Sequence, residues 1–240
     1  MMIDTLLRLK NAVMFKRLLF IVSVFLFCLF PFHSQAQEND HGTWLSVDIS
    51  KEITKKLDLE FEEEVRIFKD FSEINRFGTS LGGSYSVNKQ LKGGVGYTWL
   101  YRHDINDNFW ENRHRYYAYA TGKAELGRFT FALREKFQST YYDTSLKGND
   151  YSPVNYLRSR LEVDWDVRGF KPEPYASAEM HYQLNNPDGN EIDDWRYTLG
   201  INFPLSKKMD LDAYLRLDQE VNVKKPVNLY LIGINLKFNL

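Results

Sequence analysis

The chain has 240 residues, of which 43% are hydrophobic and 26% charged, a composition that suits one folded domain and excludes a disordered chain. Its net charge of -1, from 31 basic and 32 acidic residues, gives no basic excess and therefore argues against nucleic-acid binding. Aromatic residues make up 15% of the chain, which suits a surface that contacts both lipid and headgroups.

Residues 1–36 have the features of a secretory signal peptide. Two basic residues precede an apolar run over 18–32, and Ser-Gln-Ala at 34–36 places small residues at both cleavage-site positions. The run is shorter than the about 20 residues of a membrane-spanning helix, which disfavours a signal anchor. Met14 is an alternative start, which would leave 1–13 upstream of the true protein.

Cleavage after this segment leaves a mature chain, residues 37–240, that has no cysteine, because Cys28 is the only one. Disulfides and thiolate metal sites are then excluded, so packing or barrel closure must stabilise the fold. The mature chain has 27 basic and 31 acidic residues, a net charge of -4, after loss of Arg8, Lys10, Lys16, Arg17 and Asp4. It has no further apolar run long enough for a membrane helix, which excludes a helical membrane protein.

From Gly42 onward the dominant hydrophobic period is two, which predicts strands rather than helices. In chain order we expect strands at 43–50, 56–67, 75–87, 91–102, 112–124, 128–140, 157–167, 174–184, 195–203, 210–218 and 228–240. Most are about 10 residues or longer, which matches tilted membrane strands better than soluble ones.

The segment 157–167 shows the alternation most clearly. Its two faces are Leu157, Leu161, Val163, Trp165 and Val167 on one side, and Arg158, Arg160, Glu162, Asp164 and Asp166 on the other. Successive side chains of a strand point to opposite faces, so one face is apolar and the other charged. The segments 195–203 and 210–218 repeat this pattern.

The predicted connections alternate in length. Tight turns are expected at 87–90, 125–127, 168–171 and 206–208, and longer loops at 68–74, 103–110, 141–153, 185–193 and 221–227. Outer-membrane barrels have short periplasmic turns and longer extracellular loops. We therefore predict an all-β fold, an antiparallel transmembrane β-barrel that reaches the outer membrane after signal-peptide-dependent export.

Single-chain bacterial barrels normally have an even number of strands, whereas the pattern gives eleven. Segment 43–50 is the weakest of these strands. We favour about ten strands with this segment outside the wall, and twelve is the alternative if one strand has been missed.

The last strand has the features of a signal for the barrel assembly machinery, which with outer-membrane lipid is an expected partner. The residues concerned are Gly233, Leu236, Phe238 and Leu240. Leu240 stands where such signals usually have a terminal aromatic residue.

Residues 40–240 resemble an uncharacterised outer-membrane β-barrel family, the domain of unknown function 2490. The resemblance rests on Gly42-Thr43-Trp44, on Lys55-Lys56-Leu57 leading into Glu60, Glu62, Glu64 and Arg66, on Arg76-Phe77, and on Arg113-His114-Arg115. None of these is an active-site motif. The resemblance implies a barrel and supplies no activity.

The predicted inner face is rich in charge of both signs. Its charged residues are Asp58, Glu60, Glu62, Glu64, Arg66, Arg113, Arg115, Arg134, Lys136, Arg158, Arg160, Glu162, Asp164, Glu179 and His181. In a wide barrel they would line a channel and set its ion selectivity, whereas in a narrow barrel they would pair and fill the lumen. We favour the filled lumen, because ten strands are near the narrow end of the range.

Of the four histidines of the mature chain, His181 beside Glu179 is the best candidate for catalysis, but no serine elbow motif accompanies it, so a polar lumen residue is the favoured interpretation. Gly93–Gly96 lies in a strand pattern with no helix after it, which disfavours a phosphate loop. The acidic loop 185–194 fails the EF-hand spacing, and a solvated turn explains it. We expect no metal and no cofactor.

Aromatic residues near the long loops predict a membrane-interface belt. They are Trp99, Tyr101, Phe109, Trp110, Tyr141 and Tyr142, with Trp44 and Phe170 as less clear members. Together these features predict a non-enzymatic barrel with a structural or loop-binding role in the envelope. A small-solute channel and a wall-mounted lipid-active enzyme are the alternatives, and the sequence identifies no solute, oligomeric state or extracellular partner.

Overall fold

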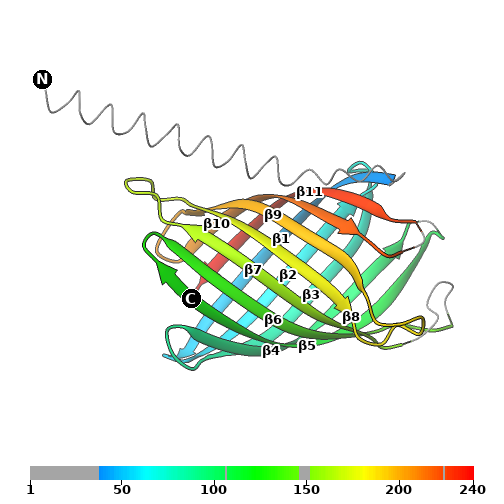
Figure 1. Cartoon of the computed structure of the whole chain (residues 1–240), viewed down its shortest axis with the longest axis horizontal. Coiled ribbons are helices and arrows are strands. Elements are labelled where there is room, and N and C mark those ends of the chain that lie inside the picture. The colour runs from blue at the N-terminus through cyan, green and yellow to red at the C-terminus, as the bar shows by residue number, and fades with distance from the viewer. Residues whose placement is uncertain (1–37, 106, 146–151, 224) are drawn as a thin grey trace, which may run out of the picture. The chain divides into compact units, whose positions relative to one another are not determined.

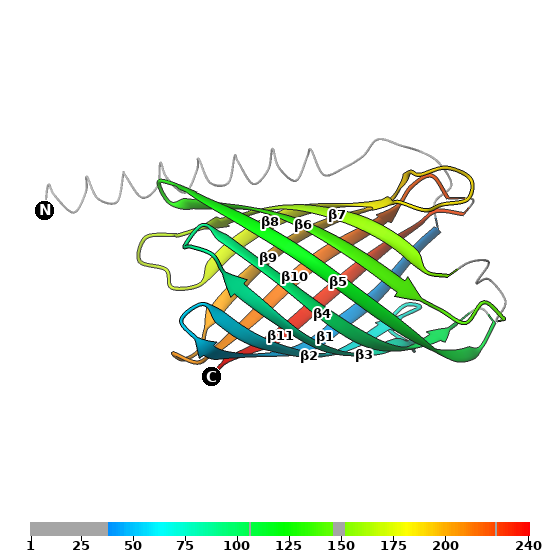
Figure 2. The ribbon, with the colours of Figure 1, turned by 90° about the horizontal axis from the view of Figure 1, so that it is seen from below.

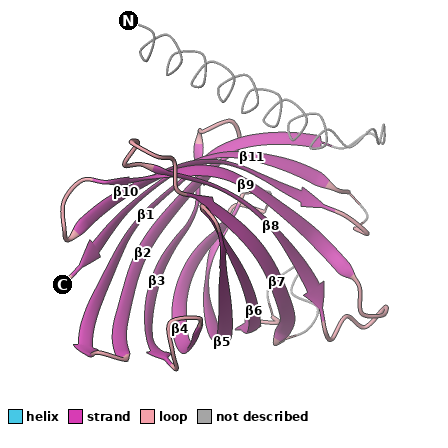
Figure 3. Ribbon diagram, turned by 60° about the vertical axis from the view of Figure 1, so that its left-hand side comes forward, coloured by secondary structure: helices cyan, strands magenta, loops and turns pink. Residues whose placement is uncertain are grey.

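The computed structural model describes residues 38–240 except 106, 146–151 and 224, and the regular elements of this part are all β-strands (Figures 1 and 3). The eleven strands form one closed barrel, and they slant across its wall (Figure 2). The all-β class and the barrel are thus confirmed. The predicted signal peptide, 1–36, lies outside the described residues.

The strand bounds follow the period-two pattern of the sequence. In chain order the strands are β1 Glu38–Thr54, β2 Leu57–Phe68, β3 Glu73–Ser86, β4 Leu91–Asp104, β5 Phe109–Leu126, β6 Phe129–Tyr141, β7 Val154–Trp165, β8 Glu173–Gln183, β9 Ile192–Pro204, β10 Met209–Glu220 and β11 Val227–Asn239. Each strand pairs antiparallel with the next one in the chain.

Closure of the barrel depends on β1, and here the expectation of ten strands with residues 43–50 outside the wall was wrong. β1 has 17 residues and pairs with β2 on one side and with β11 on the other. With an odd number of alternating strands, the first and last run in the same direction, so the closing pair is parallel. Its register runs from Glu38 beside Val227 to Ser50 beside Asn239.

The two ends of the barrel differ less in loop length than the sequence suggests. Because β2, β3, β4 and β5 extend further than predicted, two of the expected long loops shrink to residues 69–72 and 105–108. The connection 166–172, expected as a tight turn, is longer than either. Residues 142–153, 184–191 and 221–226 remain the longest connections at their end, which we call the long-loop end.

Polarity is inverted relative to a soluble barrel, with apolar side chains outside and charged ones inside. On β2, for example, Leu59 and Phe61 are exposed, whereas Glu64 and Arg66 are buried. Buried polar and charged residues outnumber the buried hydrophobic ones in the described part of the chain. The interior is therefore held by polar contacts rather than by a hydrophobic core.

Tyrosine rings inside the barrel lie over glycines of the neighbouring strand. Each tyrosine faces its glycine in the strand register: Tyr117 and Gly96, Tyr119 and Gly94, Tyr175 and Gly200, and Tyr214 and Gly233. A Cβ added at any of the four glycines would come within 3.0 Å of the tyrosine ring or its hydroxyl. The missing side chain thus makes room for the ring, a known way of supporting glycines in strands.

Parallel closure predicts a specific cross-link. Val47→Cys and Leu236→Cys would place two outward cysteines side by side on β1 and β11, as the register of these strands requires. In the refolded chain 37–240, which has no other cysteine, oxidation is expected to give a disulfide. The covalent loop makes the unfolded chain migrate faster in an electrophoretic gel until it is reduced.

The matched control pairs Val47→Cys with Leu215→Cys. Leu215 lies on β10, which β11 separates from β1. A cross-link that forms equally well in both variants, or in neither variant of a folded barrel, would contradict parallel closure.

Candidate functional site in the barrel lumen

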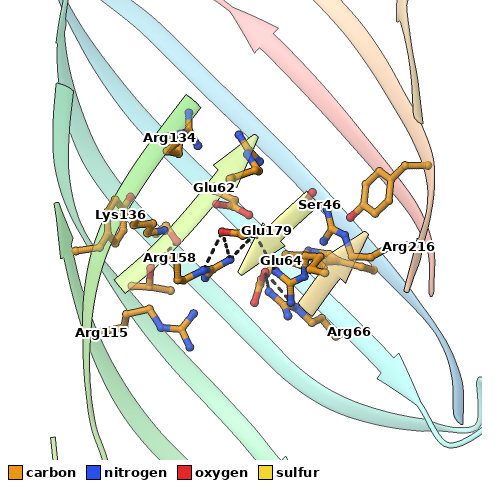
Figure 4. A pocket seen from close by; sticks show the side chains of 17 residues that line it. Ser46, Glu62, Glu64, Arg66, Arg115, Arg134, Lys136, Arg158, Glu179 and Arg216 are labelled. Atoms are coloured by element: carbon orange, nitrogen blue, oxygen red, sulfur yellow. Dashed lines mark hydrogen bonds and ion pairs between the residues drawn. The ribbon is translucent and has the colours of Figure 1, made fainter. Parts of the chain in front are cut away.

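A cavity of about 230 Å³ lies inside the barrel and brings together many of the charged residues predicted for the inner face (Figure 4). Those that line it are Glu62, Glu64, Arg66, Arg115, Arg134, Lys136, Arg158, Arg160 and Glu179. The other predicted residues also face the lumen, because they alternate with outward side chains along their strands, but they do not line the cavity. They are Asp58, Glu60, Arg113, Glu162, Asp164 and His181.

Positive charge dominates this cavity. Eight cationic side chains line it, against three carboxylates. The cations are Arg66, Arg115, Arg134, Lys136, Arg158, Arg160, Arg196 and Arg216, and the carboxylates are Glu62, Glu64 and Glu179. Side chains from opposite parts of the wall converge on the same space (Figure 4).

A chain of ion pairs links β7, β8, β9 and β10 across the inner wall. Arg158 donates from Nε and Nη2 to the two carboxylate oxygens of Glu179, both at 3.0 Å. Arg196 Nη1 lies 3.8 Å from the same carboxylate, and Arg196 Nε donates to Asp218 Oδ1 at 2.7 Å. Such two-pronged guanidinium–carboxylate contacts fix both side chains in position.

Trp44 of β1 anchors a second group of charged side chains. The guanidinium of Arg66 lies 3.2 Å from the centre of its ring, and those of Arg216 and Arg196 lie at 4.6 and 5.7 Å. Arg66 also donates from Nη2 to Glu64 at 2.8 Å. Cation–π contacts of this kind hold arginines in place without neutralising them.

Three cavity arginines contact threonines instead of carboxylates. Each donates from Nε to the threonine opposite it in the strand register: Arg115 to Thr140 at 3.2 Å, Arg134 to Thr121 at 3.0 Å, and Arg216 to Thr198 at 3.1 Å. The threonine hydroxyl orients the guanidinium but leaves its charge uncompensated.

Lys136 completes this uncompensated group. Its ammonium lies 4.0 Å from the centre of the Tyr117 ring, and in the described part of the chain it forms no ion pair with a carboxylate. Arg158 and Arg115 line the same cavity as Lys136. Arg160, by contrast, lies 3.7 Å from Glu162.

The predicted charged residues outside the cavity form smaller groups toward the two ends. At the end opposite the long loops, Lys92 of β4 forms ion pairs with Asp58 at 3.2 Å and with Glu60 at 3.1 Å. At the long-loop end Arg113 pairs with Glu111, a carboxylate that the sequence analysis did not select. The lumen is thus charged along its length and most cationic around the cavity.

His181, the best catalytic candidate of the sequence, contacts acidic groups. Its Nδ1 lies 3.3 Å from Asp194 Oδ1, and its Nε2 lies 3.8 Å from Glu179 Oε2. Within the described residues no hydroxyl or thiol forms a hydrogen bond with its ring. Among the described residues, the groups that face the His181 ring are therefore carboxylates rather than a hydroxyl or thiol nucleophile.

The predicted assembly-signal residues lie on and just after β11. Gly233 faces the lumen under the Tyr214 ring, whereas Leu236 and Phe238 alternate onto the outer face. Leu240 donates its backbone N–H to the carbonyl oxygen of Ser50 at 2.8 Å, which extends the contact with β1.

The sequence analysis missed part of the cavity wall. Arg196 and Arg216 line the cavity and alternate with apolar residues in the segments 195–203 and 210–218, so the same period-two signal was available for them. Trp44 was placed in an aromatic belt and instead lines the cavity. Tyr142, assigned to the same belt, lies under the guanidinium of Arg113 at 4.4 Å.

Neither a membrane helix nor a metal cluster is found in the part of the chain that the structure describes. No helix there is long and apolar enough to cross a membrane. No group of three or more His, Cys, Asp or Glu side chains there is arranged to hold a metal ion.

Comparison with known families assigns the chain. The family described as "Protein of unknown function (DUF2490)" matches residues 41–227, from within β1 to the first residue of β11. The chain belongs to this family. The resemblance inferred from the sequence is thereby confirmed, and the DUF2490 description adds no activity. No curated protein matches the chain.

Proposed function

We propose that this DUF2490 protein is an outer-membrane β-barrel whose lumen is closed by its own charged side chains. The observation that carries the proposal is the inverted polarity of the wall, apolar outside and charged inside. In water an apolar outer surface of this extent would be unfavourable, whereas a bilayer solvates it. Lipid of the outer membrane and the barrel assembly machinery are then its partners.

An aromatic cluster toward the long-loop end supports a membrane interface there. On the outer face of β4 and β5, Trp99 and Tyr101 stack at 6.2 Å, and Tyr101 and Trp110 stack at 4.7 Å. Tyr116 and Tyr141 extend the cluster to β6. Aromatic side chains prefer the headgroup level of a bilayer, and the long loops would then face outward from the cell.

The burial of charge inside the barrel favours a filled lumen over an open pore. Glu64, Arg66 and Glu179 are each only 7% exposed, although they point into the lumen. Side chains that line a wide aqueous channel would be much more exposed. The role that fits is therefore structural, or binding through the long loops, rather than passive transport.

A narrow anion channel is the second candidate, and the excess of cations around the cavity favours it. Planar-bilayer conductance of the refolded chain 37–240 separates the two. We expect no discrete conductance steps from the natural sequence, and steps from a variant in which Arg66→Ser, Arg158→Ser and Arg216→Ser empty the lumen. Steps from the natural chain whose anion selectivity falls with Arg115→Glu would instead establish the channel.

Two outward carboxylates interrupt the apolar wall and allow a test of lipid exposure. Glu63 of β2 and Glu135 of β6 are exposed near the middle of their strands, held by Thr79 at 3.0 Å and Ser159 at 2.6 Å. Charge at this depth of a bilayer is unfavourable. Glu135→Leu is expected to stabilise the barrel by about 1–2 kcal/mol in lipid vesicles, measured by denaturant unfolding.

Glu52→Leu is the control for this substitution. Glu52 is exposed near the end of β1 and is expected to be in water, where its replacement changes stability by less than about 0.5 kcal/mol. A loss of stability on Glu135→Leu would argue that the middle of the outer wall is not in hydrocarbon.

A further inference from the structure

The cavity has more cations than its carboxylates neutralise. Glu64 and Glu179 pair with Arg66 and Arg158, and two more cavity arginines pair with Asp218 and Glu162. This leaves Arg115, Arg134, Lys136 and Arg216 without a carboxylate among the described residues, against the single carboxylate of Glu62. Closely spaced like charges inside a protein need a counter-charge.

The uncompensated arginines also have donors to spare. Arg115, Arg134 and Arg216 each donate only from Nε, to a threonine. Among the described residues their terminal amino groups make no hydrogen bond, and they are not among the buried side-chain atoms that lack a partner. These amino groups are therefore open to the cavity. Guanidinium forks of this kind match the oxygen atoms of phosphate and similar oxyanions.

Three of the four uncompensated cations come from neighbouring strands. Arg115 lies on β5, and Arg134 and Lys136 lie on β6, so that their side chains enter the lumen from one side (Figure 4). An oxyanion in this space would meet cations on one wall of the cavity.

We propose that the lumen holds a binding site for a small multivalent oxyanion, with inorganic phosphate as its type, formed by Arg115, Arg134 and Lys136. The volume of about 230 Å³ suits a small solute rather than a large one. Glu62 opposes binding, because it is the remaining carboxylate of the cavity. Phosphate binding does not require that ions pass through the barrel. A failure of the binding test therefore leaves the proposed closure of the lumen unaffected, and the reverse also holds.

Equilibrium dialysis with radiolabelled inorganic phosphate tests the site. The refolded chain 37–240 is kept in a maltoside detergent, which has no phosphate group, with the ionic strength fixed by chloride. One saturable site per barrel is expected. Arg115→Gln and Lys136→Gln should each weaken binding about tenfold, because each removes a charged hydrogen-bond donor. Lys56→Gln, in the exposed turn between β1 and β2, should leave binding unchanged.

Glu62→Gln provides the readout that a purely structural role would not give. It should tighten phosphate binding several-fold, because it removes the opposing charge while keeping the size of the side chain. Binding that is absent in a folded, heat-modifiable barrel, or that is weakened by Glu62→Gln, would overturn the proposal. Displacement of phosphate by dihexanoyl phosphatidic acid at equal concentration would also overturn it and assign the same chemistry to a lipid headgroup.

Discussion

Asp218→Ala is expected to destabilise the folded barrel by about 3–5 kcal/mol. Asp218 accepts two hydrogen bonds from Arg196, and both residues are less than 10% exposed. Without this carboxylate, the guanidinium of Arg196 stays in the lumen, and its remaining ion pair among the described residues is the longer one to Glu179, at 3.8 Å. Leaving a buried charge without its partner costs far more than the net contribution of the pair.

Denaturant unfolding in vesicles of one lipid composition measures this effect. The matched control is Glu73→Ala, which breaks the pair between Lys69 and Glu73, where Lys69 is largely exposed. Exposed pairs contribute about 0–1 kcal/mol, so the control should lose little stability. Equal losses in the two variants would mean that the lumen around Arg196 is open to water.

Gly233→Val is expected to cost about 2–3 kcal/mol through overpacking. A Cβ at position 233 would lie 1.9 Å from Cζ of Tyr214, well inside contact distance. Relief requires the ring to leave its place on β10, where it also contacts the guanidinium of Arg216 at 4.4 Å. The substitution therefore disturbs both the wall and the lining of the cavity.

Two further variants identify the cause. Gly122→Val on β5 should have a small effect, because nothing lies within 4 Å of a Cβ at that position. Tyr214→Ala combined with Gly233→Val should recover part of the lost stability, since the clash is removed. A Gly233→Val chain that refolds with full stability in vitro but fails to assemble in cells would instead support the assembly-signal role of this glycine.

The strand pattern was predictable because the wall of the barrel is a single sheet, so every strand alternates between an outward and an inward side chain. Residues 57–68 and 154–165 each alternate between an outer apolar face and an inner charged face, and the sequence prediction places both within three residues of the observed bounds. In the part of the chain that the structure describes, no layer of helices adds a second hydrophobic period to this pattern.

The sequence could not decide the pairing of β1, and that uncertainty affected the site. The segment Glu38–Thr54 alternates weakly, and its place in the wall depends on hydrogen bonds to β11, which lies almost the whole chain length away. Single-chain bacterial barrels normally have an even number of strands, and this tendency argued against β1 as an eleventh strand of the wall. Because β1 was set aside, Trp44 was not recognised as a residue of the cavity.

The alternation of side chains along the strands also could not predict which charged residues pair with each other inside the lumen. Alternation predicts that Arg115 and Arg158 face inward, but not that one meets a threonine and the other a carboxylate. Those partners depend on the register between neighbouring strands, and a shift changes every cross-strand contact. The excess of positive charge therefore becomes visible only in the folded barrel.

Membrane fractionation tests the central claim most directly. The full chain, 1–240, would be produced in a Gram-negative bacterium, and its inner and outer membranes would be separated by density. We predict that the protein sediments with the outer membrane, resists extraction by urea, and migrates differently in a gel before and after heating. Recovery as a soluble periplasmic protein, or release by urea, would contradict the account.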